Sequence, residues 1–271
     1  MAKDTFRFFQ KAEFKSPSLI ICWDEDSGHV GPEVARHLNK QFNATPICDI
    51  RPTDFFTLGG VAIESDIAWC PQTRLYYSEK KNLLILQSSE PQFQHYQFLT
   101  AILDLAEHYC KVKDLFTING MVGSVAYLAE RRILVVFNQK EFQKQFRAYN
   151  LQSMNYEGFP AMSSYLLWLA KYRNISAVSL WPEIPFYISS NKDSYAVKKI
   201  VALFNNRLQL DFDFKELDEE IELQNTKITR LREEHSEIDE SLHNLEIGLS
   251  LSEEEQIALV MAVSKAFDQR N

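Results

Sequence analysis

The strongest constraint on the fold is a series of short apolar runs that alternate with segments of helical periodicity. Residues 18–23 (SLIICW) and 82–87 (NLLILQ) are nearly continuous apolar runs, as expected for strands buried on both faces. Each run ends in a polar turn, and a helix is expected after each, to about Gln41 and over 94–110. Strands that alternate with helices at this spacing favour crossover units and a mainly parallel sheet. The sequence therefore predicts a three-layer α/β/α core.

The same alternation continues to about residue 212, which is taken as the end of the α/β core domain (residues 1–212). Further strands are expected at 47–50, 73–78, 115–118, 133–137 and 175–180, and further helices at 141–149, 163–172 and 193–206.

A different pattern begins near Phe214 and defines a C-terminal helical extension (residues 213–271). Apolar residues recur there at alternating spacings of four and three, which is the seam of four heptads with polar interruptions at Gln224 and His235. The pattern predicts one long helix over 214–246, a stop at Gly248 and a second helix over 252–268, which together form a helical hairpin. The predicted oligomer or partner seam consists of Leu217, Ile221, Gln224, Ile228, Leu231, His235, Ile238, Leu242 and Leu245.

Two interpretations of this seam are open from the sequence. It either packs on the core of its own subunit or joins subunits. Because 16 acidic and 6 basic residues lie in 213–271, the extension carries a balance of −10, whereas residues 1–212 are nearly neutral at +2. A partner that grips the acidic helices should therefore present a basic surface, and the contact should weaken with added salt.

Charge and hydropathy exclude two classes of partner. Nucleic-acid binding needs a basic face, and the pair Arg131-Arg132 is too short to form one. No apolar run approaches the roughly 18–20 residues of a membrane span, and the first residues are charged throughout. We expect a cytoplasmic protein that binds neither nucleic acid nor membrane.

Candidate site residues lie where the predicted strands end, because ligands of open parallel sheets bind beyond the carboxyl ends of the strands. Glycine is scarce, at 8 of 271 residues, and several glycines fall at these ends. The turns that any α/β fold requires would explain them equally well. The candidates for a ligand cleft are Gly28, His29, Gly31, Glu90, Gln92, Asn119, Gly120, Glu157, Gly158, Trp181 and Glu183.

No catalytic residues, cofactor or metal are predicted. The pairs GHVG (28–31) and GMVG (120–123) match neither the dinucleotide fingerprint nor a P-loop, and the chain lacks GxSxG. Three consecutive carboxylates at 24–26 point in different directions, so a solvated loop is expected there in preference to a cation site. The four cysteines form no CxxC pair and are expected to be reduced thiols.

Taken in order, the strand-end segments resemble the proteasome assembly chaperone family, in its single-domain archaeal and bacterial branch. The segments are SLIICW with its glycine loop, LLILQSSEPQ, LFTINGMVGSV, YEGFPAMSSYLLWLA and SAVSLWPEIPFYI. The resemblance implies a core similar to nucleoside phosphorylases, a C-terminal helical extension and a homo-oligomer, with a trimer as the first expectation. It also implies that eukaryotic relatives help to assemble proteasome rings.

Two functions follow from these observations. The first, which the missing catalytic motif favours, is a non-enzymatic homo-oligomeric assembly chaperone or scaffold that holds a protein partner. The alternative is a small-molecule binding protein or enzyme with a nucleoside-like or phosphate ligand in the strand-end cleft. That alternative requires Gly28, His29, Glu90, Asn119 and Glu183 to lie close together.

Overall fold

The computed structural model of the chain describes residues 5–57, 62–64, 66–155, 157 and 161–268. Within them, ten strands form one sheet in the order β1-β3-β6-β7-β2-β8-β12-β10-β11, with β9 paired to β12. The strands are β1 (Phe6–Phe8), β2 (Ser18–Trp23), β3 (Thr45–Ile50), β6 (Thr73–Ser78), β7 (Leu83–Ser88), β8 (Asp114–Ile118), β9 (Met121–Gly123), β10 (Ile133–Phe137), β11 (Leu151–Ser153) and β12 (Ser176–Pro185). Two more strands, β4 (Ala62–Glu64) and β5 (Ile67–Trp69), pair with each other.

The four central strands, β7, β2, β8 and β12, are parallel to one another. β2 is buried along its whole length, because its apolar side chains point alternately to the two faces of the sheet and both faces are covered. Antiparallel strands β6, β3 and β1 extend the sheet on one side, and β10 lies antiparallel to β12 on the other. The predicted mixed α/β fold with a mainly parallel central sheet is confirmed. The edge strands β1 and β11 were not predicted, since three-residue strands with exposed side chains give no apolar periodicity.

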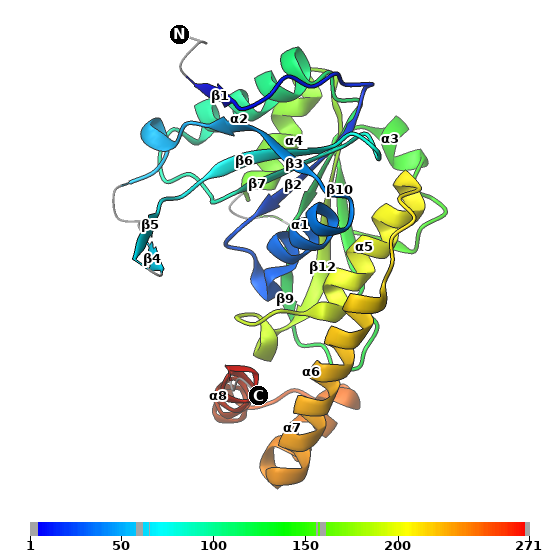
Figure 1. The fold of residues 1–271 in the computed structure, drawn as a ribbon. Helices are drawn as coiled ribbons and strands as arrows, with labels where there is room; N and C mark the ends of the chain where they lie inside the picture. Colours follow the sequence, from blue (N-terminus) through cyan, green and yellow to red (C-terminus); the bar gives the residue numbers. More distant parts are fainter. Residues whose placement is uncertain (1–4, 58–61, 65, 156, 158–160, 269–271) are drawn as a thin grey trace.

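Eight α-helices lie within the described residues. They are α1 (Val30–Gln41), α2 (His95–Asp104), α3 (Lys140–Lys144), α4 (Met162–Tyr172), α5 (Ser194–Leu208), α6 (Lys215–Glu234), α7 (Ser236–Glu246) and α8 (Glu253–Asp268). α1 and α5 contact each other on one face of the sheet, and α2 and α4 contact each other on the other face (Figure 1). Each face has its own buried cluster, with Leu38 and Phe204 in one and Phe98 and Leu166 in the other.

The C-terminal helices differ from the prediction of one long helix over 214–246. The helix is broken at His235, whose backbone is extended (φ −138°, ψ 97°), so α6 and α7 are separate. Beyond the break, Ile238 and Leu242 lie in the same buried cluster as Leu231. Arg232 fixes the bend through Asp239 and Glu246, each at 2.6 Å. Figure 1 shows α6 running from the core to the end of the molecule opposite β1, where α7 and α8 lie.

Candidate functional site

The carboxyl ends of β2 and β8 are joined through one buried carboxyl group. Asp26 follows β2, and its Oδ2 accepts a hydrogen bond from the Gly31 amide at 2.8 Å. Its Oδ1 accepts a second from the amide of Gly120, which follows β8. Burial raises the pKa of Asp26 to about 6, although the hydrogen bonds from Gly120 and Gly31 act in the opposite direction. The carboxylate expected to be solvated therefore ties two loops together.

Two of the candidate glycines are needed for close contact between these loops. A Cβ on Gly120 would lie 2.1 Å from the carbonyl oxygen of Ser27. Gly28 has a φ of +69°, and a Cβ there would lie 3.0 Å from Ile184. The amide of Gly28 also donates to the Ser189 carbonyl at 2.7 Å. At these positions the strand-end loops are packed against each other, with no room for a ligand between them.

The amide of Asn119 is part of a buried chain of hydrogen bonds. Trp23 Nε1 donates to Ser163 Oγ at 2.9 Å, and Ser163 Oγ donates to Asn119 Oδ1. Trp23 ends β2, Ser163 lies in the first turn of α4, and Asn119 follows β8. Asn119 thus holds the helix to the sheet. A tryptophan that ends a fully buried strand needs a hydrogen-bond acceptor, and this was the sequence signal for Ser163.

A second group of polar side chains lies beside β7 and faces a small cavity. Asp24 accepts hydrogen bonds from Gln87 at 3.2 Å and from Ser89 at 3.1 Å. The Glu90 amide donates to Glu25 at 2.9 Å. Burial raises the pKa of Asp24, and burial together with the Glu25 charge raises that of Glu90. The cavity has a volume of about 250 Å³ and is lined by Asp24, Cys70, Pro71, Gln72, Arg74, Tyr76, Gln87 and Ser89.

Two further candidates are exposed, and their contacts do not form a catalytic pair. The small-molecule alternative requires His29 to lie close to Glu90, but its Nε2 lies 3.1 Å from the Ser190 carbonyl. The histidine whose charge acts on Glu90 is His95. Gln92 accepts a hydrogen bond from the Thr57 amide at 2.8 Å and so fixes a neighbouring loop.

Trp181 and Glu183 were predicted to lie in a loop after a strand, and this is wrong. Both lie within β12, which continues to Pro185 because its second half pairs with β10 and β9. Glu183 is buried and forms an ion pair with Arg132 at 2.5 Å. The indole Nε1 of Trp181 is buried without a hydrogen-bond partner in the described part of the chain. Of the remaining candidates, Glu157 is exposed and Gly158 lies outside the described residues.

A fully buried ion pair supports the same edge of the sheet, and sequence reasoning missed it. Arg131 Nε donates to Asp193 Oδ2 at 2.8 Å, and the two side chains are 1% and 0% exposed. Asp193 also caps α5 by accepting from the Ala196 amide, while its own amide donates to the carbonyl of Gly28. A single Arg-Arg pair gave no sign that one arginine is buried and the next exposed.

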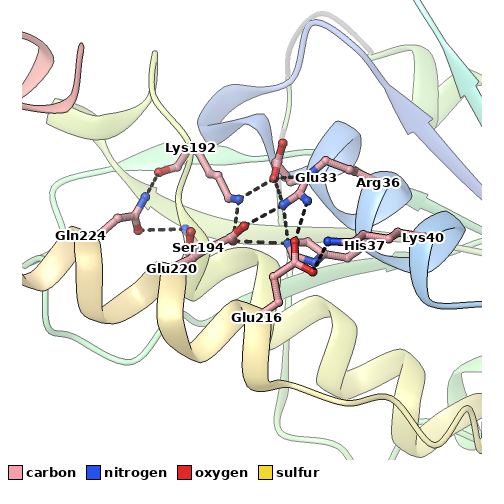
Figure 2. A network of polar contacts seen from close by, with 9 residues as sticks. All are labelled: Glu33, Arg36, His37, Lys40, Lys192, Ser194, Glu216, Glu220 and Gln224. Carbon is pink, nitrogen blue, oxygen red and sulfur yellow. Dashed lines mark hydrogen bonds and ion pairs between the residues drawn. The ribbon is translucent and has the colours of Figure 1, made fainter. Parts of the chain in front are cut away.

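The first turns of α6 are bound to the core by a network of charged side chains (Figure 2). Arg36 of α1 contacts Glu216 at 3.0 Å and Glu220 at 2.8 Å. Lys192 lies 2.5 Å from Glu220 and 2.6 Å from Glu33, and bridges α6 to α1. These contacts join segments about 180 residues apart in the sequence.

This network also shapes the ionisation of its carboxylates. Burial alone would raise the pKa of Glu220, but its bonds with His37 and Lys192 lower it to about 2. Glu33, His37 and Glu220 are close enough to hold a metal ion, with ligand atoms within 4.8 Å of one another. However, Lys192 and Arg36 already supply positive charge to both carboxylates, so the cluster is better suited to an ion-pair network than to a metal site.

The heptad seam is buried in the chain itself. Eight of its nine residues are buried, and His235, at the helix break, is exposed. The polar interruption at Gln224 has partners, since its Nε2 donates to the Lys192 carbonyl at 2.7 Å and its Oε1 accepts from the Ser194 amide at 3.2 Å. A seam between subunits would require these side chains to leave the core. Of the two interpretations, the structure shows packing within the subunit.

The outer surface of the C-terminal helices is not uniformly acidic. A groove of about 230 Å³ separates α6 from α8, and Arg230 and Lys265 lie on its walls. Its lining consists of Leu223, Thr226, Lys227, Arg230, Leu231, Glu234, His235, Ala262, Lys265 and Ala266. None of the helices in the described part of the chain combines the length and the apolar character that a membrane crossing requires.

Comparisons with known proteins identify relatives of this arrangement. Residues 25–232 match the profile of the PAC2 family, whereas no curated protein gave a significant match. A Corynebacterium glutamicum protein of unknown function is similar with a TM-score of 0.73 and 16% identity, over 97% of each chain. PbaB, an archaeal proteasome activator from Pyrococcus furiosus, has a TM-score of 0.70 and 17% identity, over 84% of this chain and 98% of its own. The proteasome-assembly chaperone homologue Rv2125 of Mycobacterium tuberculosis has a TM-score of 0.69 and 15% identity, over 79% and 94%.

Proposed function

This chain belongs to the PAC2 family, and from that membership we propose that it is a non-enzymatic, homo-oligomeric assembly chaperone or scaffold that binds a protein partner. The resemblance to proteasome assembly chaperones seen in the sequence agrees with the family match. Structural neighbours are named an archaeal proteasome activator and an archaeal homologue of proteasome-assembly chaperone. At 17–18% identity these neighbours share the fold, and their activity is carried to this chain only as part of the proposal.

The observation that carries the proposal is the closed strand-end edge. Asp26 bonds the loops after β2 and β8 together, and Gly120 brings the second loop against the carbonyl of Ser27. A ligand that occupied this position would have to displace buried backbone contacts. By contrast, large apolar side chains are exposed on helices, among them Trp168 of α4 and Met261 of α8. Exposed aromatic residues and methionines are enriched where proteins bind other proteins.

We propose that the core and the C-terminal helices have different roles. The core, residues 1–212, is an α/β/α unit of the nucleoside-phosphorylase type that supports the helices of residues 213–271. The acidic surface of those helices, for example Glu233 and Glu240, meets a basic surface of the protein partner. The protein acts in the cytoplasm as a homo-oligomer, for which the resemblance makes a trimer the first expectation.

The test combines capture of the partner with charge reversal. Chemical cross-linking and mass spectrometry of the full-length protein in its native host should recover one recurrent partner. Glu233 and Glu240 are exposed and have no ion-pair partner among the described residues. Their joint replacement by lysine should remove the partner, whereas Glu79→Lys, an exposed site on the core, should leave it in place. Retention of the partner by the helix variant would contradict the proposed contact.

A second function is favoured by one observation, the cavity beside β7. Its wall contains Asp24, Ser89 and Gln87, and the raised pKa of Asp24 is typical of carboxyl groups at binding sites. A screen of thermal stability against nucleosides, nucleotides and inorganic phosphate separates the two functions. The scaffold function predicts no shift. A reproducible rise in the melting temperature that disappears in Asp24→Ala would favour the small-molecule function.

A further inference from the structure

The outward face of α8 carries an apolar pair between two charges of opposite sign. Ile257 and Met261 are 61% and 68% exposed, and Glu254 and Lys265 are exposed as well. The spacings of three, four and four residues from Glu254 to Lys265 place all four side chains on one side of the helix. The opposite side is occupied, because Leu259 and Val263 are buried against the rest of the chain.

The two charges at the ends of this face are free of ion pairs among the described residues. Glu254 and Lys265 have no ion-pair or hydrogen-bond partner in the described part of the chain, although neighbouring Glu255 is engaged in the cap of α8 with Ser252. Ile247 and Leu249, in the connection that leads into α8, are exposed as well. The face is therefore apolar at its centre and charged at both ends, with Lys265 at its border with the groove beside α6.

The outward face of α8 is complementary to the same face of a second copy whose helix runs in the opposite direction. In an antiparallel pair of α8 helices related by a two-fold axis near residues 259–260, Glu254 of each copy lies level with Lys265 of the other. The two charges are separated by eleven residues, about 16 Å along the helix, so both cross-pairs form at once. Ile257 of each copy then lies beside Met261 of the other, and the small side chain of Ala258 leaves room for the two helices to approach closely. Such self-complementarity is the property of an isologous interface.

We propose that the outward face of α8 is a two-fold contact with a second copy of this chain. The inference rests on the proposed homo-oligomeric state and names one of its surfaces. A uniformly basic partner does not fit this face, since it would meet Lys265. A two-fold contact joins two single subunits into a dimer, or two rings into a double ring, so that two of the expected trimers would form a hexamer. In both cases, loss of the α8 contact halves the number of subunits in the assembly.

Charge exchange in the full-length protein, followed by sedimentation velocity over a wide range of concentration, tests the contact. Glu254→Lys and Lys265→Glu each place like charges opposite one another, so each should weaken the contact at least about tenfold and halve the subunit number. The double variant E254K/K265E restores both cross-pairs and should restore the assembly. Since the same helix turn is altered in Glu254→Lys and in the double variant, rescue cannot arise from helix stability. Glu253→Lys, the matched control in that turn, should leave the assembly intact.

Met261→Asp probes the apolar centre, and Tyr172→Asp on the exposed face of α4 is its control. Dissociation by Met261→Asp with an intact assembly in Tyr172→Asp is the expected result. An oligomer unchanged in all α8 variants, or one that dissociates only in Tyr172→Asp, would overturn the α8 contact while leaving the homo-oligomer standing. A wild-type protein that is monomeric at every concentration would overturn the homo-oligomer as well. Binding of the protein partner is measured separately and is not affected by either outcome.

Discussion

The carboxyl edge of the sheet and the C-terminal helices both join segments that are far apart in the sequence, but they do so with different interactions. At the edge, buried Asp26 accepts hydrogen bonds from backbone amides, buried Arg131 donates to a backbone carbonyl and to Asp193, and the loops are in direct contact. At α6, partly exposed ion pairs between long side chains add to an apolar seam. The edge should therefore tolerate little change and contribute mainly stability. The helices have an outer surface that can change without loss of the fold.

The largest expected effect separates two adjacent arginines. Arg131→Met leaves Asp193 buried without its counter-charge and should lower the free energy of unfolding by about 3–5 kcal/mol. Arg132→Met removes an arginine that is half exposed from a carboxylate that keeps 12% of its side chain exposed, so water can partly replace the guanidinium and the loss should be about 1–2 kcal/mol. Urea denaturation of both variants measures the difference. Equal losses would contradict the division between a buried edge and an exchangeable surface.

A smaller effect is expected from the loop contact itself. Gly120→Ala places a methyl group on the Ser27 carbonyl and should lower the free energy of unfolding by about 3 kcal/mol, because backbone must move. Gly123→Ala, three residues later, meets no atom within 4 Å and serves as the control with a change of about 0.5 kcal/mol or less. If thermal melting shows Gly120→Ala to be as stable as Gly123→Ala, the edge is not closed as described.

The two regions should respond to acid in opposite directions. The pKa of Asp26 is raised to about 6, so the folded state favours its protonated form. The resulting contribution to the free energy of unfolding is fully present below about pH 4 and is lost as the pH rises through 6. The pKa of Glu220 is lowered to about 2, so its contribution is present above about 4.5 and is lost as the pH falls towards 2. Because the network is partly exposed, we expect about 1–2 kcal/mol from it.

Hydrogen exchange followed by mass spectrometry resolves the two responses by region. On acidification from pH 6 to pH 3, and after correction for the intrinsic exchange rate, peptides of α6 should lose protection before those of residues 24–31. Simultaneous loss in both regions would show that the network does not control the attachment of α6.

The predictable part of the fold is the part that apolar periodicity specifies. β2 and β7 were located from continuous apolar runs, and α1 and α2 from their apolar faces. The seam of α6 and α7 was also visible, but periodicity states only which side of a helix is apolar and not what covers it. The break at His235 coincides with a polar interruption of the heptads, which was the available signal for it.

The site was less predictable, because its geometry depends on pairs of distant loops. Residue type could not distinguish Asp26, which is buried between two loops, from its neighbour Glu25, which is exposed. Trp181 and Glu183 were placed beyond the strand predicted at 175–180, whereas pairing with β9 and β10 extends this strand to Pro185.

We propose that copies of this chain meet through the outward face of α8 and that the strand-end edge is closed. Zero-length carboxyl–amine cross-linking of a mixture of isotopically light and heavy copies tests it most directly. We expect a cross-link between Glu254 of one copy and Lys265 of the other, present in mixed-isotope form and absent in Lys265→Glu. Mixed-isotope cross-links confined to the strand-end loops of residues 24–31 and 89–92, with none in α8, would contradict it.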